Sequence, residues 1–384
     1  MVNVGIMSFL GFVFWIIAAQ YFSPEDIGVA SALISAVGII TALASLGFQT
    51  SLIHFLPKSR RKEEKIWSTF WLSTTGALVL SVLFVVGTNI LTPGFTLFKD
   101  SQTFSILFVL FAIFAILFNL LDSIFIAIRR SDFVLWKNCF WSVLKVIGML
   151  ALVTLGTYGI IVSWFATLAV TFLLSLLLMN LKILFKINWD IIRNMLKYSV
   201  ANWLANLFVV LPALGLPILI AYFLGTAYTA YFYVAWTIAA LLFFVPQSVG
   251  KSYLSEESLI KTDGSLNKAL KFTYFITLIG VVVCLFASPF ILKSFGEDYF
   301  IAGFPVLVVL ILSSLSYSFN AVMTMYYNTT QKIGKVIWIN ATITLLTFVF
   351  VILTLNYGLI GVALSWTSAN IVANGIIILG ELNK

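Results

Sequence analysis

Long apolar runs separated by short polar loops follow one another along all 384 residues of the chain. The runs are about 20 or more residues long, the length that an α-helix needs to cross the hydrocarbon core of a membrane. The alternation with a period of two that marks the strands of a membrane barrel is absent. The pattern therefore predicts twelve spanning helices. They cover residues 2–22, 27–56, 67–91, 104–128, 135–155 and 158–181 in the first half, and 198–224, 229–252, 269–292, 302–327, 336–355 and 359–380 in the second.

Short combinations of residues recur about 200 residues apart, each at the same place relative to an apolar run. The pairs are Trp136-Lys137-Asn138 with Trp338-Ile339-Asn340, Ser163-Trp164 with Ser365-Trp366, Tyr158-Gly159 with Tyr357-Gly358, and Tyr21-Phe22 with Tyr222-Phe223. This recurrence predicts a duplication, a common way to build a membrane transporter. We expect an N-terminal six-helix bundle at 1–181, a linker at 182–197 and a C-terminal six-helix bundle at 198–384. The first half lacks a counterpart of 190–201, so we expect it to begin a few residues later than in related chains.

The composition excludes a water-solvated globule. Hydrophobic residues make up 61% of the chain and charged residues 9%, with a mean hydropathy of +1.09, whereas a soluble chain carries roughly 25% charged residues. Since lipid offers the backbone no hydrogen bonds, we expect an all-α polytopic membrane protein. No basic segment precedes the first run, so we interpret it as a span and not as a cleaved signal.

The basic residues predict the orientation of the chain. Its net charge is +8, but the lysines and arginines occupy short loops on one side of the runs and form no single patch for nucleic acid. One set of loops, with the C-terminus, holds 19 of the 22 lysines and arginines, while the opposite loops hold only Lys99 and Lys293. The positive-inside rule then places both termini in the cytoplasm of a cell (plasma or inner) membrane protein. Six spans per half return the chain to its starting side, so the repeats are parallel.

The linker 182–197 has an amphipathic pattern. Trp189, Ile192 and Leu196 fall on one helical face, while Lys186 and Arg193 lie away from it. The pattern favours a short helix on the inner membrane surface, with its cations near anionic lipid headgroups. A plain linker is the alternative.

Asp122 and Lys145 are charged residues inside predicted spans. Both are expected at a depth of about 10–12 Å from the cytoplasmic boundary, on antiparallel neighbours, so the two charges can pair. An unpaired lysine facing lipid costs at least about 2.5–3.5 kcal/mol. One interpretation is a structural ion pair between helices. The other is a functional site, in which Lys145 faces a central cavity and attracts an anionic substrate group while Asp122 positions it or carries a coupling proton.

The seventh predicted span contains two asparagines and two prolines. Asn202 and Asn206 are four residues apart and share a helical face. Pro212 and Pro217 are expected to bend or break the helix. Such interruptions point to a substrate path or a hinge, although asparagine hydrogen bonds between helices and a simple proline kink explain the same residues.

A set of polar residues is expected near the cytoplasmic ends of the spans, where it would line a basic mouth. Its members are Gln49, His54, Arg129, Arg130, Lys137 and Lys251. The alternative is that they are interfacial residues that obey the charge rule.

The sequence lacks the patterns of common catalytic and nucleotide sites. It contains no HExxH, GxSxG or Walker A motif and only one histidine, so no catalytic set can be assembled. Cys139 and Cys284 lie in apolar surroundings and are interpreted as core residues. We therefore expect neither an enzyme nor a cofactor or metal site. Active transport would need an ion gradient, of Na⁺ or H⁺, or another energy source.

Several segments resemble one family. Residues 21–57, YFSPEDIGVASALISAVGIITALASLGFQTSLIHFLP, resemble the opening of polysaccharide or O-antigen flippases of the multidrug/oligosaccharidyl-lipid/polysaccharide exporter superfamily, in the Pro-Glu-Asp turn at 23–28, the Leu46-Gly47 pair and the basic loop from Phe55. Residues 198–202 and 252–258 and the loop Phe295-Gly296-Glu297-Asp298-Tyr299 are similar to segments of some members. His54 departs from the basic residue that many members carry.

The resemblance implies two six-helix bundles around a central cavity that opens alternately to each side. It implies transfer of a polyprenyl (pyro)phosphate-linked oligosaccharide from the inner to the outer leaflet, with membrane lipids and glycan assembly enzymes as neighbours. Two other functions stay open. A multidrug exporter of the same superfamily would need a buried acidic site, for which Asp122 is the candidate. A glycan polymerase or ligase would need larger outer loops with catalytic charges.

Overall fold

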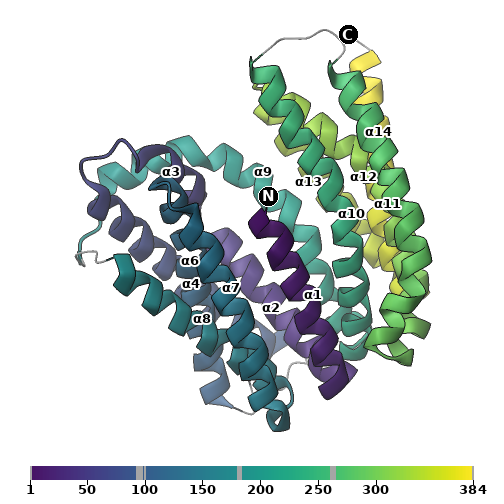
Figure 1. Cartoon of the computed structure of the whole chain (residues 1–384), viewed down its shortest axis with the longest axis horizontal. Helices are drawn as coiled ribbons and strands as arrows, with labels where there is room; N and C mark the ends of the chain where they lie inside the picture. Colours follow the sequence, from purple (N-terminus) through teal and green to yellow (C-terminus); the bar gives the residue numbers. More distant parts are fainter. Residues whose placement is uncertain (1, 92–97, 99–100, 180–183, 260–264, 383–384) are drawn as a thin grey trace. The chain divides into compact units, whose positions relative to one another are not determined.

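The computed structural model describes residues 2–91, 98, 101–179, 184–259 and 265–382, with the side chains of 2–4, 89–91, 251–259, 265 and 382 excepted. In this part of the chain all regular structure is helical (Figure 1). The first helices are α1 (Val2–Tyr21), α2 (Pro24–Ala44), α3 (Phe48–Phe55), α4 (Lys62–Leu91), α6 (Gln102–Ala127), α7 (Ser131–Ala151), η1 (Val153–Leu155) and α8 (Thr157–Met179). Then follow α9 (Trp189–Phe223), α10 (Thr226–Leu259), α11 (Ser265–Phe295), α12 (Glu297–Thr329), α13 (Ile333–Thr354), η2 (Leu355–Tyr357) and α14 (Gly358–Leu382).

The membrane-spanning character predicted from the apolar runs is confirmed. Ten segments of the described chain are long and apolar enough to cross a membrane, the last of which contains both α13 and α14, and α1 adds a shorter apolar helix. Within the described ranges, twelve helices have 20 or more residues, the length that the hydrocarbon core requires. The protein is a multi-pass α-helical membrane protein.

The chain divides into two compact units, Met1–Leu207 (unit 1) and Phe208–Lys384 (unit 2). The division lies inside α9, about ten residues beyond the predicted start of the second bundle at 198. The start of α9 belongs to unit 1 because hydrogen bonds hold it there. Ser51 Oγ donates to the carbonyl of Met195 over 2.8 Å, and Trp203 Nε1 donates to the carbonyl of Ala42 over 2.8 Å.

Residues 189–197 of the predicted linker and the seventh span form one helix, which differs from both predicted forms. Residues 184–188 are not helical, α9 begins at Trp189, and it runs without interruption to Phe223 with Pro212 and Pro217 inside it. Of the predicted apolar face, Ile192 is buried, as is Met195 beside it, while Trp189 is 65% exposed. The prolines do not break the helix, because α9 is continuous through both. That they bend it stays a prediction.

The second predicted span is interrupted instead. It consists of α2 and α3, separated at Ser45, Leu46 and Gly47. Leu46 and Gly47 have φ angles of 46° and 76°, a left-handed conformation that a helix cannot contain. A Cβ on Gly47 would lie 2.8 Å from the Cβ of Ser199, so glycine also permits α9 to approach closely.

Turns in the two units match at a spacing of 202 residues. Arg129 and Gln331 have φ angles of 62° and 57° at the ends of α6 and α12. Gly156 and Gly358, with φ angles of 56° and 59°, follow η1 and η2. These equivalent turns correct one detail of the sequence alignment. The residue that matches Gly159 is Gly361, not Gly358. A Cβ added to Gly159 would lie 2.1 Å from the carbonyl oxygen of Leu152, and a Cβ added to Gly361 would lie 2.2 Å from that of Thr354.

The Pro-Glu-Asp turn ties the start of α2 to that of α8 within unit 1. Ser23 caps α2 through its side chain, which accepts from the Asp26 backbone N–H. Asp26 Oδ1 in turn accepts hydrogen bonds from the backbone N–H and the hydroxyl of Thr157, over 2.9 and 2.6 Å. The motif therefore has a structural role in this chain.

Candidate functional site

The hairpin of α6 and α7 carries the charges inside unit 1. Residues at equal distances from the turn of an antiparallel hairpin lie level with each other. Asp122 is seven residues before Arg129, and Lys137 is seven residues after Arg130. The Lys137 Nζ accordingly lies 3.0 Å from Oδ1 of Asp122. The hairpin therefore brings one half-buried carboxylate and one buried ammonium together.

The expected pair of Asp122 with Lys145 is not formed. Lys145 lies eight residues beyond Lys137 on α7, which is about 12 Å deeper along the helix axis. The sequence placed Lys137 in a loop at the cytoplasmic mouth, but its side chain is only 1% exposed and its Nζ donates to the carbonyl of Phe118 over 3.1 Å. Lys137 is thus an interior residue whose charge is paired.

Lys145 is buried among aromatic rings. Its side chain is 3% exposed, and its Nζ lies 4.3 Å from the ring centroid of Trp141, 4.5 Å from that of Trp164 and 5.1 Å from that of Phe14. Each such cation–π contact contributes about 0.5–2 kcal/mol, more when water is excluded. Among the described side chains, rings and not a carboxylate surround this ammonium. The indole N–H of Trp164 is also buried without a hydrogen-bond partner.

The spacing of residues along α7 is a sequence signal for this site. Lys137, Trp141 and Lys145 follow one another at intervals of four residues, so they lie along one face of α7. Phe118 and Asp122 have the same spacing on α6, and the rings of Phe118 and Trp141 lie 5.4 Å apart. The contributions of Phe14 from α1 and Trp164 from α8 are tertiary, and no local pattern predicts them.

The candidate mouth residues come from several elements of the chain. Gln49 and His54 lie on α3, where the His54 ring stacks on Tyr198 with centroids 4.4 Å apart. Arg129 and Arg130 form the exposed turn between α6 and α7. The Arg130 guanidinium is engaged by the Asp132 carboxylate at 3.1 Å.

The remaining candidates lie elsewhere. Asn202 and Asn206 are exposed on the part of α9 that belongs to unit 1. The side chain of Lys251, and those of the similar segment 252–258, lie outside the described residues. Within the described residues, no group of histidine, cysteine, aspartate and glutamate side chains could hold a metal ion.

Unit 2 has an aromatic and amide cluster in the matching place. Trp366, 202 residues after Trp164, packs against Trp236 and Tyr317 with ring centroids 5.3 and 6.0 Å apart. Gln247 Nε2 donates to the Tyr317 hydroxyl over 2.7 Å. The described side chains of this cluster are uncharged, whereas the cluster of unit 1 contains the Lys145 ammonium.

Comparisons with known proteins agree with this architecture. A family model described as "Polysaccharide biosynthesis protein" matches residues 17–302. No curated protein matches the sequence.

Solved structures show the same fold at low sequence identity. The lipid II flippase MurJ in an inward closed conformation is 17% identical with a TM-score of 0.81, covering 100% of this chain and 87% of its own. An inward-facing multidrug resistance MATE family transporter of the MOP superfamily is 16% identical with a TM-score of 0.73, covering 98% and 94% of the two chains. A MOP superfamily transporter from Pyrococcus furiosus, whose reverse polarity of the binding pocket suggests a different function, is 15% identical with a TM-score of 0.60, covering 100% and 94%.

Proposed function

Because the chain belongs to the polysaccharide biosynthesis protein family, we propose that it moves a polyprenyl (pyro)phosphate-linked oligosaccharide from the inner to the outer leaflet of the cell membrane. The transported molecule would supply the assembly of a cell-surface polysaccharide, with glycan assembly enzymes acting before and after it. Transport would proceed by alternating access, driven by a gradient of Na⁺ or H⁺ or by another source.

The observation that carries the proposal is the excess of positive charge inside unit 1. The interior there contains two buried lysines and one carboxylate, Asp122, which is paired with Lys137. Lys145 is left with aromatic neighbours. A lipid-linked sugar has an anionic phosphate that cations bind and a glycan that stacks on aromatic rings. We assign Lys145 to the phosphate in a transport state in which the rings around it have moved apart.

The aromatic cover offers a second donor for such a substrate. The buried Trp164 N–H has no partner in the described structure, and an unpaired buried donor is costly unless a ligand or a conformational change uses it. Together, the ammonium and the indole N–H present two donors to phosphate or sugar oxygens from α7 and α8.

A multidrug exporter is the competing proposal because MATE transporters share the fold. Such an exporter of cations needs a carboxylate that is free to bind a cation or a proton. The candidate carboxylate, Asp122, lies 3.0 Å from a buried ammonium. The local charge therefore favours an anionic substrate.

The test is the leaflet distribution of the lipid-linked oligosaccharide in cells that lack this protein and any redundant flippase. We expect the oligosaccharide to accumulate in the inner leaflet and to reach the outer leaflet again when the gene is restored. Normal outer-leaflet delivery in its absence would remove the proposal. Increased sensitivity of the same cells to cationic drugs, with normal glycan delivery, would establish the exporter instead.

A further inference from the structure

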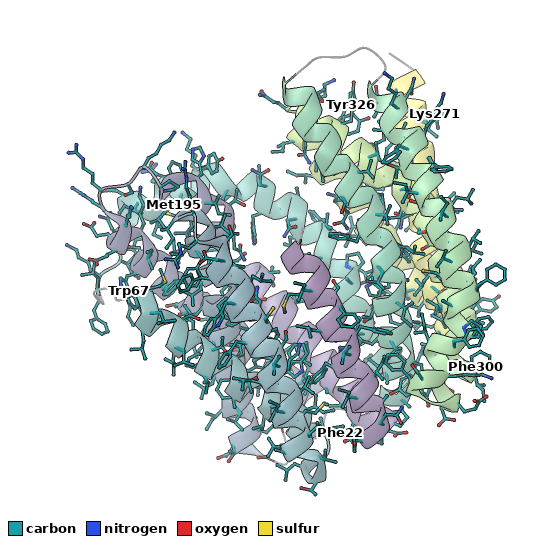
Figure 2. The ribbon with its side chains drawn as sticks, viewed as in Figure 1. Phe22, Trp67, Met195, Lys271, Phe300 and Tyr326 are labelled. Carbon is teal, nitrogen blue, oxygen red and sulfur yellow. The ribbon has the colours of Figure 1, made fainter. Side chains whose placement is uncertain are left out.

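A cavity of about 500 Å³ lies at the basic end of unit 1, between the end of α3, the start of α4 and the first turns of α9. Three cationic side chains line it, Arg60, Arg61 and Lys65. Phe55 and Met195 contribute an apolar wall. Met195 is visible where α9 meets α3 (Figure 2). The cavity thus has a cationic rim and an apolar wall. It is formed by other helices than the Lys145 cluster, which comes from α1, α7 and α8.

Hydrogen bonds fix the three elements that form the walls. The fully buried Ser51 of α3 donates to the carbonyl of Met195 on α9 over 2.8 Å. The backbone N–H of Asn188 donates to Ser68 Oγ of α4 over 2.9 Å. The Asn188 side chain donates to Glu64 Oε2 over 3.1 Å. Because these bonds join α3 to α9 and α4 to Asn188, the residue directly before α9, the cavity is formed before any ligand binds, which reduces the ordering cost of binding.

The positive charge of the cavity is only partly compensated by carboxylates of the described residues. Glu64 lies 4.0 Å from Arg61, but these side chains are 40% and 69% exposed, and such a pair contributes little. The ion pairs of the described residues leave Arg60 and Lys65 without a carboxylate within 4.0 Å. The Lys65 ammonium lies 5.7 Å from the Phe55 ring centroid. Two arginines and a lysine therefore face a space that an anion would fill, and arginine binds phosphate through paired hydrogen bonds.

The surroundings indicate a ligand that resides in the membrane. Phe185 and Trp189, which directly precede the cavity-lining part of α9, are 82% and 65% exposed. Exposed aromatic residues of this kind anchor a segment at the level of the lipid headgroups. The basic loops of this end are those that the charge rule places in the cytoplasm. An anion at this depth is most simply the headgroup of an inner-leaflet lipid.

We propose that this cavity is a binding site for the phosphate group of an inner-leaflet lipid, with Arg60, Arg61 and Lys65 holding the phosphate and Phe55 and Met195 contacting the start of the acyl or prenyl chain. The site is separate from the one assigned to transport. Its occupant is either a bulk anionic phospholipid or the phosphate of a polyprenyl carrier, and the two share this chemistry.

The test is lipid binding to the full-length protein in neutral detergent, measured by native mass spectrometry. The probes are phosphatidylglycerol, zwitterionic phosphatidylcholine, undecaprenyl phosphate and inorganic phosphate. The variant Arg60→Gln with Lys65→Gln removes two cavity cations. The control variant Lys58→Gln with Lys62→Gln removes the same charge from the same segment, the loop before α4 and the start of α4, from residues that do not line the cavity. Thermal unfolding of both variants checks that they are folded.

We expect phosphatidylglycerol or undecaprenyl phosphate to bind more tightly than phosphatidylcholine, and the cavity variant to weaken that binding about ten- to thirty-fold. The control variant should weaken it less than about three-fold. Preference for undecaprenyl phosphate over phosphatidylglycerol would identify the carrier as occupant, and equal binding would identify bulk lipid. Equal losses in the two variants, no loss in the folded cavity variant, or full displacement of lipid by inorganic phosphate would overturn the proposal.

Discussion

Lys145 in unit 1 and Thr347 in unit 2 are 202 residues apart and are both buried on the helix that follows a left-handed turn. The same spacing relates Lys137 to Ile339 and Asp122 to Thr324. Unit 2 thus has no charge at any of the three positions where unit 1 has one. The turns Arg129 and Gln331 nevertheless have nearly the same φ. Charge is therefore not needed at these positions to build the arrangement of helices seen in unit 2.

Near the turns that join the same helices, a pair of aromatic rings in unit 1 is replaced by charged and polar residues in unit 2. In unit 1, Phe125 stacks on Phe133 with ring centroids 5.4 Å apart. The matching residues of unit 2 are Tyr327 and Lys335, and both contact Glu381, which accepts from the tyrosine hydroxyl over 2.7 Å and from the ammonium over 2.9 Å. A stacked aromatic pair in unit 1 and an ionic cluster in unit 2 thus occupy equivalent positions. The comparison teaches that the repeated backbone tolerates either chemistry wherever each polar group is paired.

The largest expected effect comes from breaking the buried ion pair of unit 1. Asp122→Ala leaves the Lys137 ammonium buried and unpaired, which should lower the free energy of unfolding by about 3–5 kcal/mol. Denaturant unfolding in a fixed detergent measures this loss. The Lys137→Ala variant should lose less, because Asp122 is partly exposed, at 28%, and water can reach it.

A double variant sharpens this comparison. Asp122→Thr together with Lys137→Ile gives unit 1 the residues of unit 2 and should recover most of the stability lost by Asp122→Ala, since removing both charges of a buried pair is often neutral or stabilising. The threonine hydroxyl can donate to the backbone carbonyl four residues earlier in its helix, so it need not stay unpaired. A double variant as unstable as Asp122→Ala would show that unit 1 cannot adopt the uncharged solution.

The next effect tests whether the turns are equivalent. Gly159→Ala and Gly361→Ala each place a Cβ against a backbone carbonyl oxygen, at 2.1 and 2.2 Å, so each should lower the free energy of unfolding by about 1–3 kcal/mol. Gly375→Ala is the control, because nothing lies within 4 Å of its added Cβ. Clearly different losses at Gly159 and Gly361 would contradict the equivalence of the two turns.

The smallest effect concerns the ionic cluster of unit 2. Glu381→Gln should lower the free energy of unfolding by about 0.5–1 kcal/mol, since Lys335 and Glu381 are 38% and 33% exposed and water screens the pair. The same unfolding assay applies, with Tyr327→Phe removing the hydroxyl alone. If Glu381→Gln lowered the free energy of unfolding as much as Asp122→Ala, the stability of the fold would depend on charge at the ends of the helices as well as in their interiors.

The apolar runs predicted the twelve long helices because the length of a spanning helix is fixed by the membrane. The interruption at Leu46 and Gly47 was not predicted, since it depends on the close approach of Ser199, a tertiary contact. The sequence also left open whether Pro212 and Pro217 bend or break α9, because a helix packed among others can accommodate proline without a break.

For the site, the sequence identified Asp122 and Lys145 as unusual but paired them wrongly. The error came from placing Lys137 in the loop. The turn of the hairpin at Arg129 sets Asp122 level with Lys137, and the helical ends defined by hydropathy were too imprecise to locate that turn. The ring cluster around Lys145 comes from three helices and needs the folded structure.

The most direct test of the account is the flipping rate of a polyprenyl pyrophosphate-linked oligosaccharide by the purified protein in proteoliposomes, comparing the wild type with Lys145→Thr. This variant introduces the residue that unit 2 carries at Thr347, so the protein should fold with unchanged spectroscopic helicity. We predict that its flipping rate falls at least about ten-fold, the loss of one charge-assisted contact. A folded Lys145→Thr protein that flips at the wild-type rate would contradict the assignment of the unit 1 charge to the substrate.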